Sequence, residues 1–153
     1  MNRRGALSLL AAGGLAALAP ARAAPPAPPV EVFKSPTCGC CGAWVEHLQA
    51  AGFAVTVRTV GNTTGVRRRL GLPDAFASCH TATVGGYVLE GHVPAADVKQ
   101  LLARRPVALG LAVPGMPQGS PGMETPDGQR DAYDVLLIDK QGKASVFAHH
   151  PKV

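Results

Sequence analysis

The sequence predicts a single mixed α/β domain, because short alternating apolar segments are interleaved with segments of helical composition. In chain order the expected elements are β-α-β-α-β-β-α. A C-x-x-C pair, Cys38 and Cys41, lies between the first predicted strand and the first predicted helix. This element order, with a cysteine pair at that junction, is typical of a thioredoxin-like domain. A long loop rich in Gly, Pro and Met and a C-terminal β-hairpin are expected to follow.

Hydrophobic periodicity and Gly or Pro residues place the individual elements. In the first helix, Trp44 and Leu48 fall on one apolar face. Gly85-Gly86 joins two short strands as a hairpin, and Pro94 opens the last helix of the order. The predicted strands are 30–33, 53–60, 81–84 and 87–89, the predicted helices are 43–51, 64–70 and 95–103, and the terminal hairpin pairs 133–138 with 143–148.

Residues 1–23 are predicted to be a secretory signal peptide. Residues 2–4 are a basic segment, residues 6–19 are an apolar segment too short to span a membrane comfortably, and Ala21-Arg22-Ala23 is a cleavage site. Residues 24–29 read as a stiff Pro-rich linker, which leaves 30–153 as one thioredoxin-like domain. We therefore expect a periplasmic protein with no membrane anchor once the signal is removed. The paired arginines leave the general secretory and twin-arginine routes both open.

Charge gives no indication of a nucleic-acid partner. The chain has 15 Lys and Arg against 10 Asp and Glu, and removing Arg3, Arg4 and Arg22 with the signal leaves 12 against 10. The one basic run, Arg67–Arg69, lacks aromatic neighbours and is predicted to be the solvated face of a helix. No Ser-His-Asp set, carboxylate pair or phosphate-binding loop is recognisable in the sequence.

The chemistry is expected at the cysteines. Cys38, Cys40 and Cys41 fall in four consecutive positions at a helix N-terminus, where the partial positive charge lowers thiol pKa values. Cys38 is the expected nucleophile and Cys41 the resolving thiol of a redox pair. A static disulfide for that pair, and a buried apolar role for Cys40, are the alternatives.

Cys79 is expected to join this group. In a thioredoxin-like fold the loop before the third strand passes the active-site cysteines, and here that loop carries Cys79 where thioredoxins carry a cis-proline. Four thiolates suit Cu(I), Zn(II) or an iron–sulfur cluster. Because three of the sulfurs are crowded into one tight cluster, the sequence favours Cu(I), as one ion or as a multinuclear cluster, with zinc as the weaker alternative.

Two methionines are further candidate copper ligands. Met116 and Met123 both lie in the aperiodic stretch 108–131, which is expected to be one long loop. A thioether favours Cu(I), and a methionine in a loop has little role in a core. A small hydrophobic plug over the site is the equally weighted alternative.

The five histidines are expected in different places. His80 adjoins Cys79 and is a candidate ligand or proton donor, and His92 lies at a strand-to-helix turn from which it could approach the same end of the sheet. His47 is predicted to face solvent from the first helix. His149 and His150 are predicted to lie in a frayed C-terminal tail, with weak divalent-metal binding as the alternative.

Four ordered motifs carry a family resemblance: V-F-K-S-P-T-C-G-C-C-G at 32–42, S-C-H-T at 78–81, V-G-G-Y-V-L-E-G-H-V-P at 84–94 and G-L-A-V-P-G-M-P at 110–117. Together they resemble a bacterial CopG-like family that accompanies copper resistance and was formerly a domain of unknown function. The resemblance covers about residues 30–148. It implies a thioredoxin-like fold holding copper through Cys38, Cys40, Cys41 and Cys79, with a proposed copper–thiol oxidoreductase role.

Three functions remain in competition at this level. The leading one is an exported copper-binding protein that acts in copper resistance as a copper–thiol oxidoreductase. The second is a metal-free thiol–disulfide oxidoreductase using Cys38 and Cys41. The third is a Cu(I) chaperone without redox chemistry, which passes copper to a periplasmic efflux or carrier protein.

Overall fold

The computed structural model describes residues 26–153. The predicted signal peptide at 1–23 and the first two linker residues lie outside the described residues. Residues 26–29 of the linker have no regular secondary structure. None of the helices within residues 26–153 has the length and apolar character of a membrane span.

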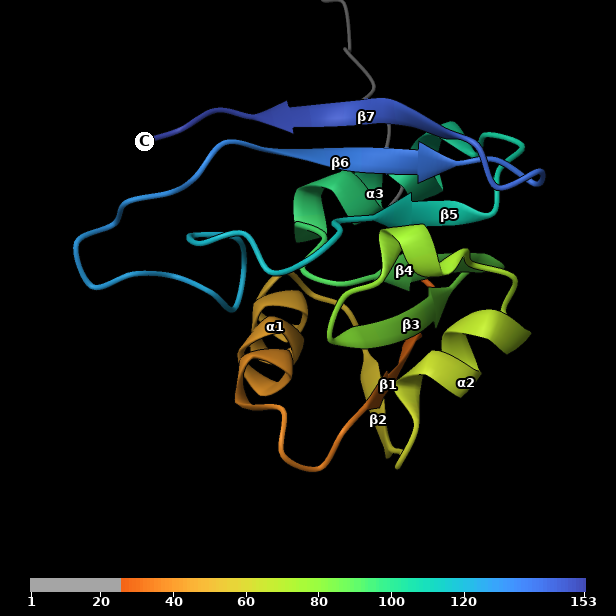
Figure 1. Ribbon diagram of the computed structural model, residues 1–153, viewed down its shortest axis with the longest axis horizontal. Coiled ribbons are helices and arrows are strands. Elements are labelled where there is room, and N and C mark those ends of the chain that lie inside the picture. The colour runs from red at the N-terminus through yellow and green to blue at the C-terminus, as the bar shows by residue number, and fades with distance from the viewer. Residues whose placement is uncertain (1–25) are drawn as a thin grey trace, which may run out of the picture.

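A seven-stranded sheet in the order β2-β1-β3-β4-β5-β6-β7 organises the domain (Figure 1). The strands are β1 (Val30–Lys34), β2 (Val55–Thr59), β3 (His80–Val84), β4 (Tyr87–Glu90), β5 (Gly110–Ala112), β6 (Tyr133–Ile138) and β7 (Ala144–His150). The helices are α1 (Gly39–Ala50), α2 (Thr63–Arg69), the short 3-10 helix η1 (Asp74–Phe76) and α3 (Ala95–Arg104). Strand β1 is parallel to β2 and antiparallel to β3, and β6 and β7 are an antiparallel hairpin.

The α/β class, the predicted element order and the terminal hairpin are confirmed. The first helix begins earlier than predicted, at Gly39, because Cys38 takes the extended conformation of an N-cap and the cysteines that follow are already helical. The prediction of one unbroken loop over 108–131 is wrong, since β5 lies within it and pairs with both β4 and β6. Gly110 permits this pairing, because a Cβ there would collide with the Val88 carbonyl oxygen.

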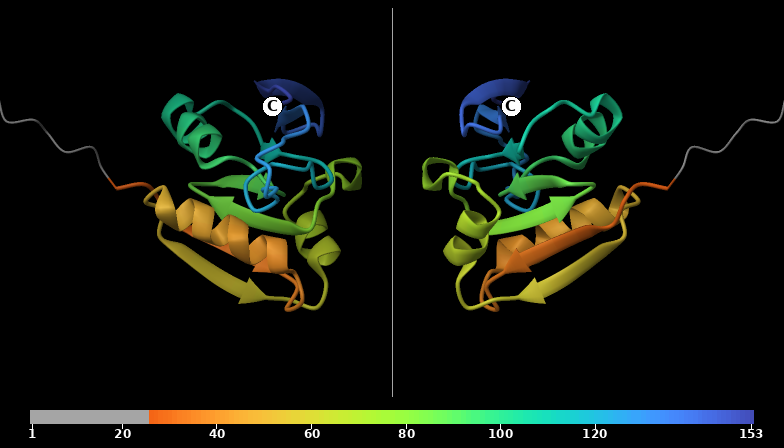
Figure 2. Two further views of the ribbon diagram at one scale, coloured as in Figure 1. Left: turned by 90° about the vertical axis from the view of Figure 1, so that its left-hand side faces the viewer. Right: turned by 90° about the vertical axis from the view of Figure 1, so that its right-hand side faces the viewer.

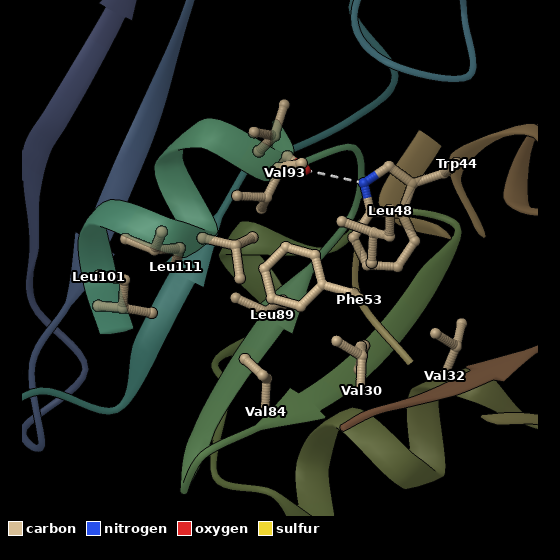
Figure 3. Close-up of a cluster of buried hydrophobic side chains, with 14 of the residues drawn as sticks. Val30, Val32, Trp44, Leu48, Phe53, Val84, Leu89, Val93, Leu101 and Leu111 are labelled. Carbon is tan, nitrogen blue, oxygen red and sulfur yellow. Dashed lines mark hydrogen bonds between the residues drawn. The ribbon is translucent and has the colours of Figure 1, made fainter. Parts of the chain in front are cut away.

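The sheet has a helix layer on each face, with α1 and α3 on one side and α2 on the other (Figure 2). The larger apolar cluster lies under α1 and α3, where Leu48 and Leu101 pack against Leu89 and Leu111 of the sheet (Figure 3). All four leucines are fully buried, and burying a leucine side chain contributes about 1.5–3 kcal/mol to stability. A smaller cluster around Leu72 lies on the opposite face of the sheet. This second cluster anchors the segment that leads into β3.

The prediction of a solvated Arg67–Arg69 run is wrong for Arg67. Its side chain is buried, with Nη1 3.3 Å from a carboxylate oxygen of Glu90 and Nη2 3.1 Å from one of Asp74. Arg68 stays exposed and pairs with the other oxygen of Asp74. The buried Glu90 carboxylate requires a counter-charge, which draws one arginine of the run inward.

The prediction of a frayed C-terminal tail is also wrong. His149 and His150 belong to β7, and His150 is paired in register with Tyr133 of β6. The His150 ring stacks on the Tyr133 ring and its Nε2 lies 2.8 Å from a carboxylate oxygen of Asp97 in α3. The C-terminal strand is therefore fixed to the helix layer by a side-chain contact as well as by its sheet hydrogen bonds.

Candidate metal and redox centre

The four cysteine sulfurs meet where α1 begins. Cys38 is the N-cap of α1, Cys40 and Cys41 lie in its first turn, and Cys79 is the last residue before β3. Because β3 lies beside β1 in the sheet, the segment that enters β3 passes the strand-to-helix junction that carries the other three. The Sγ–Sγ distances are 3.6 Å between Cys38 and Cys40, 3.8 Å between Cys40 and Cys79, and 3.7 Å between Cys41 and Cys79.

Two oxidation levels are present in this cluster. Cys38 and Cys41 form a disulfide, whereas Cys40 and Cys79 are free thiols. All four sulfurs lie within 4.8 Å of one another, so together they could hold a metal ion. A disulfide sulfur is a poor ligand compared with a thiolate, so two-electron reduction of the bridge would turn a two-thiol site into a four-thiol site.

A second group of potential ligands shares Cys79 with the first. The Cys79 sulfur lies 3.3 Å from Nδ1 of His80 and 3.1 Å from Nε2 of His92. The potential ligand atoms of the three side chains all lie within 4.8 Å of one another, so they could hold one metal ion. Nδ1 of His92 is 2.7 Å from the Pro121 carbonyl oxygen, so Nδ1 donates a proton there and the Nε2 lone pair faces the sulfur. Cys79 therefore stands between a sulfur group and a nitrogen group.

Burial keeps these side chains uncharged in the metal-free protein. Burial, with the nearby His92 second, lowers the pKa of His80 to about 3, and burial also lowers the pKa of His92. Burial, with the neighbouring Cys40 sulfur second, raises the pKa of the Cys79 thiol to about 12. Nε2 of His80 is buried without a hydrogen-bond partner in the described residues. A cation that replaced the Cys79 proton would thus meet two neutral imidazoles already positioned as donors.

A buried carboxylate fixes the segment that carries Cys79. Glu90 of β4 is 0% exposed, and it accepts hydrogen bonds from the Ser78 N–H at 2.7 Å and from the Thr81 hydroxyl at 2.6 Å. These two donors flank Cys79 in the chain. Burial is the main reason that the pKa of Glu90 is raised, and Arg67 supplies the opposing charge. This arrangement could not be predicted from the sequence, because no local pattern joins a glutamate to a loop twelve residues earlier.

The turn that carries His92 is held by two side chains of α1. Nε1 of Trp44 donates to the Val93 carbonyl oxygen at 2.8 Å (Figure 3). Nε2 of His47 accepts from the Ala95 N–H at 3.0 Å. The prediction that His47 faces solvent is therefore wrong: α3 begins after Pro94, whose side chain offers no capping group, and His47 supplies the acceptor. Burial lowers the pKa of His47, which keeps that acceptor uncharged.

The long loop after β5 returns to the start of α1 (Figure 1). A Cβ at Gly122 would lie 2.7 Å from the Cys40 carbonyl oxygen and 2.8 Å from the backbone nitrogen of Trp44. The absence of a side chain at this glycine therefore allows the loop to pack directly on α1. Its neighbour Pro121 supplies the oxygen that orients His92. The loop is thus part of the wall of the centre.

Both candidate methionines belong to this loop. Met116 is 52% exposed, and the adjacent Gly115 is bound to the cysteine segment through the Ser78 hydroxyl and through the Ala77 carbonyl oxygen. Met123 is half-buried, and its N–H donates to the Ser120 carbonyl oxygen at 2.7 Å. The structure places both residues on the loop that covers the centre, and their role as copper ligands stays a prediction.

Two solved structures share this fold and much of the sequence. They are forms 1 and 2 of copper resistance protein copG, each 46% identical to this chain with a TM-score of 0.77. Each match covers 82% of this chain, and 98% and 99% of the respective copG chains. The chain belongs to the copG family of copper resistance proteins. The family expected from the four motifs is thereby confirmed.

Another match agrees with this copG assignment. A family described as "Protein of unknown function, DUF411" matches residues 76–123. That range runs from the segment before Cys79 into the loop between β5 and β6, as far as Met123, and it includes His80 and His92. No curated protein sequence matches the chain.

Proposed function

We propose that this protein binds Cu(I) through Cys38, Cys40, Cys41 and Cys79 and acts in copper resistance as a copper–thiol oxidoreductase. One observation supports this above the others: a disulfide lies inside a set of four sulfurs that fall within 4.8 Å of one another. In such a set, the redox state of one pair decides how many thiolate ligands a soft metal meets. Copper handling and thiol chemistry would therefore be coupled in a single centre.

The coupled reaction balances within the chain and its copper substrate. Two thiols, those of Cys38 and Cys41, lose two electrons and two protons and form the S–S bond. Two Cu(II) ions each accept one electron and become Cu(I). The remaining thiols of Cys40 and Cys79 lie 3.8 Å apart and would be the first ligands available to the reduced ion.

The donor set favours Cu(I) over zinc. Structural zinc sites use four ligands that point at one tetrahedral centre. Here Cys79 contacts two sulfurs and two imidazole nitrogens, which is more than one tetrahedral ion can use. A bridging thiolate between neighbouring soft ions uses such an arrangement fully, so a multinuclear Cu(I) cluster is the occupancy we expect.

The cellular setting completes the proposal. The signal-like N-terminus would direct the chain to the periplasm, where disulfides persist. The similar solved proteins are named for copper resistance. A periplasmic copper efflux or carrier protein would then be the receiver of the reduced ion.

The main rival is a metal-free thiol–disulfide oxidoreductase, and the Cys38–Cys41 disulfide at a helix start is the observation that favours it. Two further sulfurs within 4 Å of that pair count against it, because they offer internal partners that compete with a protein substrate. Reduction of insulin distinguishes the two, since the rival function requires turnover without copper. The exposed Met116 favours a third function, transfer of Cu(I) to an acceptor without a redox change.

Anaerobic Cu(I) titration against a competing chelator tests the proposal. The fully reduced protein is expected to bind copper tightly and to protect all four thiols from alkylation, whereas the disulfide form should bind less. Cys79→Ser is expected to lower the copper stoichiometry while the domain stays folded. His149→Gln, which changes a histidine on the exposed side of β7, is the control. Equal copper binding by Cys79→Ser and the parent chain would refute the four-sulfur site.

A further inference from the structure

We propose that Cys40 and Cys79 are a second redox couple, so that one chain can pass four electrons rather than two. This inference rests on the proposed copper–thiol chemistry and extends it to the pair that is still reduced. The state seen here, with one disulfide and two free thiols, would then be the half-oxidised form of the centre.

The geometry of the free pair supports a bond between them. The sulfurs of Cys40 and Cys79 are 3.8 Å apart, whereas a disulfide requires about 2.0 Å. The two residues belong to separate pieces of backbone, the first turn of α1 and the segment before β3. Closing the gap therefore needs only a small local movement and no break in the sheet.

The Cys40–Cys79 bond is also the one that is left when the strained pairings of the four cysteines are excluded. Four cysteines can pair in three ways. One way joins Cys40 to its direct neighbour Cys41, and another joins Cys38 to Cys40 across a single residue, so each closes a small strained ring. The third way keeps the observed Cys38–Cys41 bridge and leaves Cys40 with Cys79. Full oxidation thus has one unstrained outcome.

The second step has the same balance as the first. The thiols of Cys40 and Cys79 lose two electrons and two protons as their S–S bond forms, and two further Cu(II) ions are reduced to Cu(I). No thiol remains after this step, so the fully oxidised chain would release its copper. The number of electrons lost would thus set how much Cu(I) the centre can hold.

The second bridge would also have a distinct effect on stability. It would connect residues that are 39 positions apart, whereas the first connects residues 3 positions apart. A bridge across a longer loop restricts the unfolded chain more strongly. Closing it should raise the melting temperature on the order of 10 °C, which is about twice the effect of the first bridge.

Electron counting tests the inference. Fully reduced protein is mixed anaerobically with excess Cu(II) and a Cu(I)-specific chromogenic chelator, and disulfides are then mapped by mass spectrometry. We expect four Cu(I) per chain, a mapped Cys40–Cys79 bond and the higher melting temperature. Cys79→Ser should stop at two Cu(I), and the double variant Cys38→Ser with Cys41→Ser should also give two, through the remaining pair.

The outcomes separate this inference from the function on which it rests. Two Cu(I) from the parent chain, with Cys40 and Cys79 still free, would overturn the second couple and leave the first intact. A mapped Cys41–Cys79 or Cys38–Cys40 bond would overturn the proposed pairing. No Cu(I) at all would overturn both.

Discussion

Replacing Glu90 by glutamine tests whether the buried carboxylate holds the Cys79 segment. The amide oxygen of glutamine can still accept from the Ser78 N–H, and its NH₂ can donate to the Thr81 hydroxyl. The lost interaction is the charge opposite Arg67, whose side chain is only 5% exposed and keeps Asp74 as its other partner.

The magnitude follows from these contacts. A hydrogen bond to a charged group contributes about 1.5–3 kcal/mol, and an uncompensated buried charge costs more. Two effects reduce the loss: Arg67 keeps one carboxylate, and the substitution removes the burial penalty that raises the pKa of Glu90. We therefore expect Glu90→Gln to lower the free energy of unfolding by about 2 kcal/mol, which moves a urea midpoint by about 1 M.

Two measurements check this prediction. Urea unfolding gives the loss of stability, and timed alkylation with mass spectrometry gives the reactivity of Cys79 relative to Cys40. Glu31→Gln is the matched control, because Glu31 pairs with Arg58 on the surface, where an ion pair contributes about 0–1 kcal/mol. The alkylation ratio should rise for Glu90→Gln alone. Equal midpoints for the two variants, with an unchanged Cys79 ratio, would show that the carboxylate does not position the segment.

Two further predictions concern the histidines and the covering loop. Burial holds the pKa values of His47, His80 and His92 below 6.5, so the unfolded chain takes up protons first and the metal-free protein should lose stability as the pH falls below 6.5. His80 alone contributes up to about 1.4 kcal/mol per pH unit, and a flat thermal stability profile between about pH 4 and pH 7 would contradict this. Gly122→Ala should cost about 1–3 kcal/mol more than Gly128→Ala, because both glycines have positive φ but only the first would bring its methyl group against α1. Chemical unfolding compares the two variants, and equal losses would show that close packing at this turn is unimportant.

The parts of the fold that the sequence predicted are those with local signals. Alternation, the Gly85-Gly86 turn and Pro94 located the first strands and helices, and the structure confirms them. Strand β5 was missed because it has three residues, too few to show a period, and because its pairing depends on the absence of a side chain at Gly110 beside Val88. A contact of that kind joins residues far apart in the chain and leaves no periodic pattern.

The same division holds for the candidate centre. The approach of Cys79 and His92 to the cysteine cluster followed from the expected order of elements. The roles of Arg67, Glu90 and His47 did not, because each is defined by a partner on another element. A polar residue inside a strand and a helix that starts after proline are signals that such partners exist, but they do not identify them.

The loop between β5 and β6 closes the centre from the C-terminal part of the chain. Cys38, Cys40 and Cys41 can meet as soon as α1 forms, since they share one helical turn. The Pro121 oxygen that orients His92 lies on a loop that starts from β5 and is closed at its far end by β6. The reactive sulfurs therefore belong to the N-terminal part of the centre, and the segment that covers them comes from the C-terminal part. A chain without its C-terminal strands would therefore lack this cover and leave the thiols open to any oxidant or metal nearby.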